Sequence, residues 1–143
     1  MTFRRIDNYR MLFENDSINE LLKTCIFNAT NGKVQNVAQS VYAKTQGRFY
    51  VLEEDGVLIG LIGGSVIDND LLIIKHLAVK ETHRGQGYAK KLVKEVQHLG
   101  DFMTLQVGCD HHFVDFFKAC DFKCKLIKGD DFTADNYECL LKI

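Results

Sequence analysis

Proline, long apolar runs and an excess of charge of either sign are all missing from this chain. With 18 basic and 19 acidic side chains the net charge is -1, so the chain lacks the positive balance that nucleic-acid-binding proteins carry. Its longest apolar-rich stretch, Val57–Ile67, is interrupted by glycines and is too short to span a bilayer. The start, Met1–Asp7, has no apolar segment typical of a secretory signal. We therefore expect a soluble cytoplasmic protein that has neither nucleic acid nor a membrane as its partner.

Cysteine is present, but not in a pattern that indicates a metal site or a disulfide framework. The five cysteines form an odd set without a Cys-x-x-Cys pair, and we expect reduced thiols. Sulfur and imidazole ligands gather around the run Cys109-Asp110-His111-His112, but their spacing matches no common zinc pattern, so no metal site is predicted. The cysteines are Cys25, Cys109, Cys120, Cys124 and Cys139.

The chain is long enough for one domain, which we expect to cover residues 1–143, and 46% hydrophobic residues can bury an ordinary core. Glycine and Asn/Asp mark the turns, among them Asp55-Gly56 in a tight hairpin and Asn31-Gly32 between two helices. Ser17 and Glu20 have the spacing of a capping box. The predicted order is a strand, two helices, three antiparallel strands, a helix, a strand, a helix and two strands, an α+β pattern. The predicted strands are 3–7, 48–53, 57–67, 71–79, 102–107, 122–127 and 137–143, and the predicted helices are 17–28, 34–46, 88–99 and a short one capped by Asp110.

The segment Arg84-Gly85-Gln86-Gly87-Tyr88-Ala89 joins an apolar strand to an amphipathic helix. The first N–H groups of a helix have no intrahelical partner, and phosphate groups bind there readily. Gly85 and Gly87 allow a phosphate to approach the main chain closely, because they have no Cβ atom. Two better-known phosphate loops do not fit: Lys90 stands where the dinucleotide fingerprint needs a small residue, and no Gly-Lys-Ser/Thr triplet is present.

Together with Leu77-Ala78-Val79, the pattern Arg84-x-x-Gly87-x-Ala89 resembles the acyl-CoA signature of the GNAT superfamily of N-acetyltransferases, usually written Arg/Gln-x-x-Gly-x-Gly/Ala. The resemblance implies a single-domain α+β fold with a mixed, mainly antiparallel sheet of six to seven strands and helices on both faces. In that fold the fourth and fifth strands splay apart and hold the pantetheine arm between them, and a homodimer is compatible with it. The implied acetyl-CoA-binding residues are Leu77, Ala78, Val79, Arg84, Gly85, Gln86, Gly87, Tyr88, Ala89 and Asp110, the last in place of a commonly seen asparagine.

The catalytic side chains are less clear, because two residues depart from the family pattern. Lys75 stands where many members carry a glutamate that acts as the base, and Phe117 stands where many carry a tyrosine that acts as the acid. His76 has an ordinary pKa suited to a base and is the candidate, although a histidine at such a position more often has a structural role. Other conceivable acids, each of which could instead serve packing, are Tyr88, Cys109 and Tyr137.

The resemblance implies transfer of an acetyl group from acetyl-CoA to a primary amine of a small molecule or peptide, by direct attack through a tetrahedral intermediate. The loss of the usual glutamate and tyrosine leaves a second hypothesis open. In that hypothesis the chain is a catalytically silent sensor or regulatory module that binds acyl-CoA.

Overall fold

Seven strands form one sheet, in which a single pair of neighbours is parallel. The structure is a computed structural model that describes residues 1–26 and 28–143. The strands are β1 (Thr2–Arg5), β2 (Gly47–Glu54), β3 (Val57–Ile67), β4 (Leu71–Val79), β5 (Thr104–Cys109), β6 (Lys123–Ile127) and β7 (Asn136–Lys142). The helices are α1 (Met11–Glu14), α2 (Asp16–Lys23), α3 (Asn31–Val37), α4 (Tyr88–His98) and α5 (Val114–Ala119), with a π-helix η1 (Ala38–Tyr42) and a 3-10 helix η2 (Glu81–His83).

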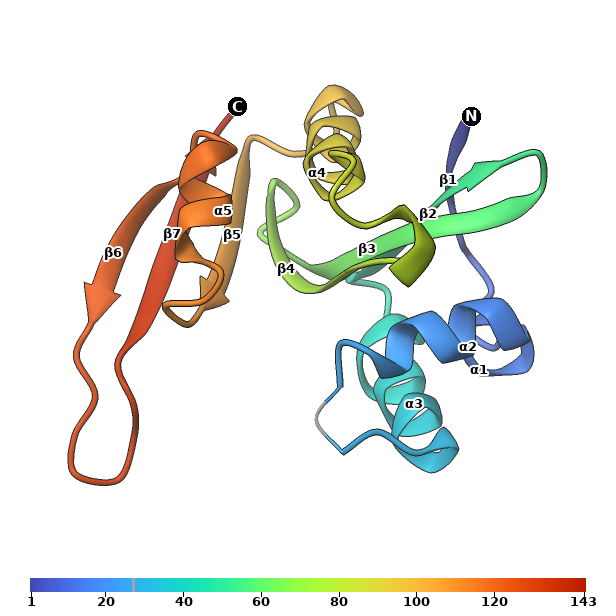
Figure 1. Cartoon of the computed structure of the whole chain (residues 1–143), viewed down its shortest axis with the longest axis horizontal. Helices are drawn as coiled ribbons and strands as arrows, with labels where there is room; N and C mark the ends of the chain where they lie inside the picture. The colour runs from blue at the N-terminus through green and yellow to red at the C-terminus, as the bar shows by residue number, and fades with distance from the viewer. Residues whose placement is uncertain (27) are drawn as a thin grey trace.

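The sheet order is β1-β2-β3-β4-β5-β7-β6, and only β4 and β5 run parallel. Helices cover both faces: Figure 1 shows α1–α3 on one side of β2 and β3 and α4 on the other, with α5 beside β5 and β7. The mixed, mainly antiparallel sheet of six to seven strands predicted above is therefore confirmed.

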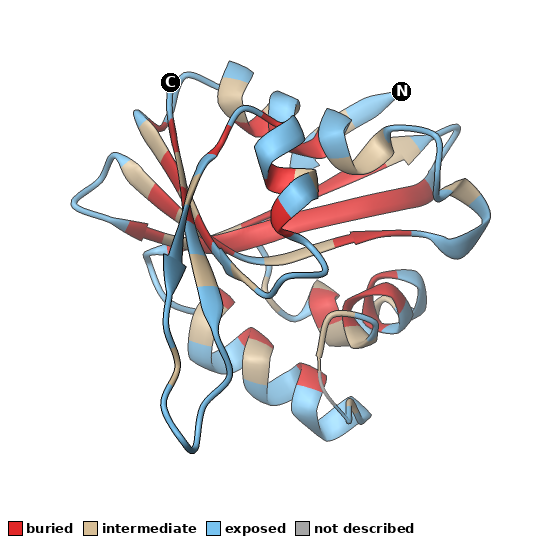
Figure 2. Ribbon diagram, turned by 60° about the vertical axis from the view of Figure 1, so that its left-hand side comes forward, coloured by how far each residue is buried: buried red, intermediate tan, exposed pale blue. Residues whose placement is uncertain are grey.

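Two hydrophobic cores lie on the two faces of the sheet. Along β2 the side chains alternate: Tyr50 and Leu52 join the core under α4 and α5, while Phe49 and Val51 join the core under α1–α3 and η1. We call these the α4/α5 core and the α1–α3 core. Phe49 and Leu52 are each only 1% exposed, and burying such a side chain stabilises the fold by about 1.5–3 kcal/mol. Figure 2 shows the buried centres of the long strands between outer helix surfaces that are exposed.

The N-terminal helices begin and end differently from the prediction. Asn15, rather than Ser17, caps α2, because its side chain accepts a hydrogen bond from the N–H of Ile18 at 3.1 Å. The short helix α1 precedes it and was not predicted. Helix α2 ends at Lys23 rather than near residue 28, and position 27 of the predicted helix lies outside the described residues.

Further boundaries also differ from the prediction. Asn31 and the glycine after it do not break the helix but form the first turn of α3, because Thr30 accepts a hydrogen bond from the N–H of Lys33 at 3.2 Å. The first strand ends at Arg5. Asp110 lies in the turn before α5 and does not cap it, since its carboxylate bonds within that turn.

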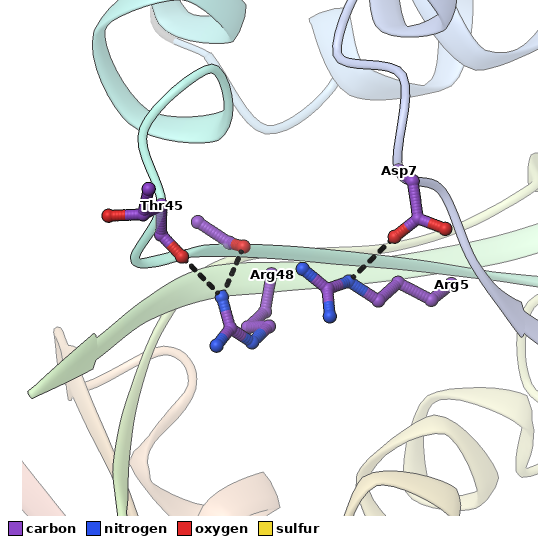
Figure 3. Close-up of polar contacts among 5 residues, drawn as sticks. Arg5, Asp7, Thr45 and Arg48 are labelled. Carbon is purple, nitrogen blue, oxygen red and sulfur yellow. Dashed lines mark hydrogen bonds and ion pairs between the residues drawn. The ribbon is translucent and has the colours of Figure 1, made fainter. Parts of the chain in front are cut away.

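The turn between η1 and β2 is held by one arginine side chain. Arg48 donates from Nη1 to the carbonyls of Thr45 at 2.8 Å and Gly47 at 2.9 Å (Figure 3). Nearby, Arg5 pairs with Asp7 at 3.1 Å where β1 leaves the sheet. The bonds of Arg48 hold the turn through which the chain passes from η1, which ends at Tyr42, into β2.

A β-bulge at Lys75 divides β4 into two halves. Across from it, Gly64 pairs with Ile74 and Gly63 pairs with His76, so that Lys75 has no partner on β3. In a regular strand Ile74 and His76 would face the same side. Here Ile74 packs in the α4/α5 core, whereas His76 contacts Tyr42 on the opposite face.

The expectation of reduced cysteines is wrong for one pair. Cys124 of β6 and Cys139 of β7 are direct partners across the two antiparallel strands, with Cα atoms 4.0 Å apart, and they form a disulfide. Cys25, Cys109 and Cys120 are free. Sequence spacing did not reveal the pair, because only the register of the two strands brings these residues together.

We expect the chain, purified without reductant and then unfolded, to present three thiols to a thiol reagent, and five after reduction. Cys139→Ser should add one reactive thiol to the unreduced protein, because it releases Cys124. As a control, Cys120→Ser should remove one. Five reactive thiols before reduction would contradict the pairing.

Candidate active site

Strands β4 and β5 separate part-way along their length. They pair only where Leu71–Ile74 lies beside Thr104–Val107. Strand β4 continues to Val79 and β5 to Cys109, so a gap opens between the two C-terminal ends. This is the place where a parallel sheet exposes main-chain polar groups without a neighbouring strand to bind them.

The register with β3 determines which main-chain groups face this gap. The N–H of Lys80 donates to the carbonyl of Ile59 on β3 at 2.7 Å. In an antiparallel ladder every second residue points its N–H and C=O groups toward the partner strand. By this alternation Ala78 bonds toward β3, while Leu77 and Val79 point their polar groups into the gap. The methyl group of Ala78 lies in the α1–α3 core, so this residue supports the segment from behind.

Two side chains donate hydrogen bonds to main-chain carbonyl groups on this edge of β4. The thiol of Cys25 donates to the carbonyl of Leu77 at 3.6 Å, and Nε of Arg84 donates to the carbonyl of Val79 at 3.0 Å. The N–H groups of Leu77 and Val79 are then the donors that face the gap. Arg84 also folds the chain after β4 back onto the strand end, which positions the glycines that follow.

The glycine loop adopts the open conformation that its sequence predicts. Gly85 and Gly87 have φ angles of +76° and +86°, and a Cβ atom built on either would meet no atom of the described residues within 4 Å. Gly87 is the N-cap of α4, and no side chain in the described part of the chain caps the helix. The first N–H groups of α4 are therefore accessible to a ligand, and the helix dipole favours an anion there.

Other residues predicted to bind the cofactor lie around this loop and across the gap. Tyr88 is half-buried, and its ring contacts that of His83 with centroids 5.8 Å apart. Gln86 is exposed, and Ala89 packs against the α4/α5 core. Asp110 follows the end of β5, and its carboxylate accepts from the N–H of His112 at 2.9 Å.

His76 lies beside the gap on the α1–α3 face of the sheet. Its Nδ1 atom is 2.6 Å from the hydroxyl oxygen of Tyr42, which comes from η1. Burial, together with the nearby charge of Lys75, lowers the pKa of His76 to about 4. The imidazole is therefore neutral near pH 7, while Lys75 itself is exposed on the bulge.

The residue at the position where many family members carry a tyrosine packs in the α4/α5 core. Phe117 is 5% exposed and stacks edge-on with Phe116 and Phe122, at centroid distances of 5.1 and 5.4 Å. Tyr137 is half-buried against the α4/α5 core, and Sγ of Cys109 lies 3.9 Å from Sγ of Cys139. Burial raises the pKa of Cys109, as does the charge of Asp110.

Sequence reasoning missed Cys25 and Tyr42. Both fit the apolar spacing of the N-terminal helices, which explains their burial and gives no sign of a polar partner. Their partners, the carbonyl of Leu77 and the ring of His76, are 52 and 34 residues away in sequence. Only the fold brings these groups to the same strand edge.

A surface cavity of about 590 Å³ lies outside the gap, between α2, the start of β3 and the loop around Arg84. Its charged rim is partly paired internally, since Arg4 bonds Glu53 and Lys23 bonds the rim residue Glu20. Neither His76 nor the glycines of the loop line it. In the described part of the chain, no group of three or more His, Cys, Asp or Glu residues is arranged to hold a metal ion.

The model of the acetyltransferase (GNAT) family matches residues 15–122 of the sequence. The chain belongs to the GNAT family. The matched region contains β4, the glycine loop, α4, β5 and α5, so it includes both sides of the gap.

The chain is similar to one acetyltransferase in sequence and to others in structure. Over 60 residues it is 40% identical to the probable N-acetyltransferase family 8 member 5 of Mus musculus, a match that covers 38% of this chain and 26% of that protein. A GNAT acetyltransferase structure from Desulfovibrio desulfuricans is 15% identical with a TM-score of 0.74, covering 99% of this chain and 98% of that one. A GNAT acetyltransferase from Elizabethkingia anophelis with acetyl-CoA bound is 15% identical with a TM-score of 0.70, covering 99% and 97%.

We expect His76 to make stability depend on pH. Its pKa is lowered from the ordinary 6.5 to about 4, so the unfolded chain binds more protons between these values. The stabilisation is complete above pH 6.5 and is lost as the pH falls toward 4, by on the order of 3 kcal/mol. Urea unfolding of the wild type and of His76→Gln should therefore differ in slope against pH over this range. The exposed His98→Gln serves as the control and should follow the wild type.

Proposed function

We propose that the chain is a single-domain N-acetyltransferase, covering residues 1–143, that moves an acetyl group from acetyl-CoA to a primary amine of a small molecule or peptide. The gap between β4 and β5 carries this proposal. It presents the main-chain N–H groups of Leu77 and Val79 next to a loop whose own N–H groups are open to an anion. An extended amide chain that ends in a diphosphate has the shape and chemistry to use both.

In this proposal the diphosphate of acetyl-CoA binds the N–H groups of 84–89, which Arg84 positions through its bond to Val79. The pantetheine arm lies in the gap along Leu77 and Val79, with Asp110 at the opposite strand end. Acetyl-CoA acts as a co-substrate, and the reaction uses no metal. Bringing the amine and the thioester together in this geometry supplies a large part of the rate.

His76 is the catalytic side chain that we propose. It is the imidazole on the β4 segment beside the gap, and it is neutral near pH 7 because burial lowers its pKa. Lys75 is exposed and Phe117 has no proton to give, so neither can take the role that the family usually assigns to its position.

We propose a cytoplasmic location. The proposed partners are acetyl-CoA and an amine, and neither nucleic acid nor a membrane is involved. A homodimer is compatible with the fold. No helix in the described ranges 1–26 and 28–143 is long and apolar enough to cross a membrane. The cytoplasm is reducing, so the Cys124–Cys139 disulfide of the structure would form there only under oxidising conditions.

A second candidate function is supported by the same two substitutions. With Lys75 in place of the usual glutamate and a buried Phe117 in place of the usual tyrosine, the chain could bind acyl-CoA without turnover and act as a sensor. Such a module would keep the gap and the glycine loop unchanged.

An assay of CoA release separates the two functions when it is combined with calorimetry. Purified protein is incubated with acetyl-CoA and a panel of polyamines, aminoglycosides, amino acids and peptides, and acetylated product is identified by mass spectrometry. Amine-dependent CoA release supports the enzyme. Tight acetyl-CoA binding with silence across the panel favours the sensor, and no binding at all contradicts both.

We expect Gly87→Glu to weaken acetyl-CoA binding by about 100-fold or more. The new side chain blocks the loop and repels the diphosphate, so about two charge-assisted hydrogen bonds between them are lost. Gly100→Glu is the matched control, because Gly100 has a φ of +77°, close to the +86° of Gly87, and equally open surroundings at the other end of α4. Both variants should lose a similar stability of about 1–2 kcal/mol. Equal acetyl-CoA affinity in the two, measured by calorimetry, would refute the loop as the binding site.

A further inference from the structure

The contact between Tyr42 and His76 joins the N-terminal helices to the catalytic strand. The hydroxyl oxygen of Tyr42 lies 2.6 Å from Nδ1 of His76, and the two rings are 5.6 Å apart between centroids. Tyr42 is 7% exposed. A short hydrogen bond between buried groups is electrostatically stronger than one in water.

The surroundings of Tyr42 hold its hydroxyl group in one position. Its ring packs edge-on against Phe49, with centroids 5.0 Å apart and planes at 79°. On β3, a Cβ atom at Gly63 would lie 2.5 Å from the hydroxyl oxygen, so only glycine leaves room for it. The hydroxyl group of Tyr42 is therefore held in a fixed position beside His76.

The buried hydroxyl determines which imidazole nitrogen carries the hydrogen. A tyrosine O–H needs an acceptor when it is buried, and Nδ1 of His76 is the one that the described hydrogen bonds provide for Tyr42. If Nδ1 carried the hydrogen, the tyrosine O–H would have no acceptor among the described residues. The O–H of Tyr42 therefore donates to Nδ1, and the hydrogen of the neutral ring lies on Nε2.

Burial and the charge of Lys75 keep the imidazole neutral. Burial lowers the pKa of His76 and raises those of Tyr42 and Cys25, and the positive Lys75 on the same strand further disfavours the imidazolium. A neutral ring with hydrogen on Nε2 is a weak base. It is nevertheless a good hydrogen-bond donor, and such a ring can polarise a carbonyl group.

We propose that Nε2–H of His76 donates a hydrogen bond to the thioester carbonyl oxygen of acetyl-CoA, and that Tyr42 is the positioning residue that fixes this tautomer. The inference rests on the acetyl transfer proposed above. The amine nitrogen attacks the carbonyl carbon, a C–N bond forms, and the carbonyl π electrons move to oxygen, where the N–H group stabilises the charge. When the C=O bond re-forms, the C–S bond breaks. The CoA thiolate takes a proton from water, and the amine nitrogen loses one to water.

The tautomer is tested without any assay of activity. In long-range ¹H–¹⁵N spectra of histidine-labelled protein near pH 7, His76 should show a bare Nδ1 and a protonated Nε2, and its signals are assigned by their loss in His76→Gln. Tyr42→Phe should weaken this preference. Tyr50→Phe, the same change at a tyrosine that is 3% exposed in the α4/α5 core, should leave it unchanged. Hydrogen on Nδ1 in the wild type would overturn the proposal.

Turnover with an accepted amine tests the donor role. The side-chain N–H of glutamine can replace Nε2–H but cannot act as a base, so His76→Gln should retain kcat within about tenfold of the wild type, whereas His76→Ala should lose about 100- to 1000-fold. Tyr42→Phe should lower kcat about tenfold, and Tyr50→Phe should not. Equal losses in His76→Gln and His76→Ala would show a base and overturn the donor role. A wild type that is silent on every amine, yet shows the expected tautomer, would refute the acetyl transfer and not the hydrogen-bond assignment.

Discussion

The end of hydrogen bonding between β4 and β5 is the constraint on which the rest of the site depends. Main-chain polar groups are costly to leave without partners, so the segment beyond Ile74 must find them elsewhere. Cys25 and Arg84 bind two of the carbonyls, and in doing so they tie the N-terminal helices and the glycine loop to the same strand edge. The donors that remain are what makes this edge suited to a ligand rich in amide and phosphate groups.

The two faces of the sheet contribute different parts of the site. The α4/α5 face supplies the helix whose N-terminus is open beyond Gly87, together with the packed Phe117. The α1–α3 face supplies His76, Tyr42 and the thiol of Cys25. The aromatic packing on one face and the imidazole on the other belong to separate cores, so the two can change separately in such a fold.

Sequence patterns predicted the parts of the molecule that depend on local rules. The hairpin of β2 and β3, the apolar stripe of α4 and the turn at Asp55 follow from residue spacing and local conformation, and the structure has them. The glycine loop was found in the same way. The patterns did not show that Tyr42 meets His76, or that two cysteines face each other across β6 and β7, because these pairs depend on strand register. The cap of α2 was misplaced by two residues, since Asn15 and Ser17 are both good capping residues.

The bulge at Lys75 has a consequence for how the two halves of β4 direct their side chains. Gly64 pairs with Ile74 and Gly63 pairs with His76, so the extra residue lets side chains two positions apart point to opposite faces. Deleting Lys75 would keep these pairs and restore a regular ladder, and His76 would stay on the side of Tyr42. Pairing Lys75 with Gly63 instead would shift the rest of β4 by one residue and turn the imidazole toward the opposite helices. Because the lysine stays unpaired, the imidazole keeps to one face while Ile74 stays in the core of the other.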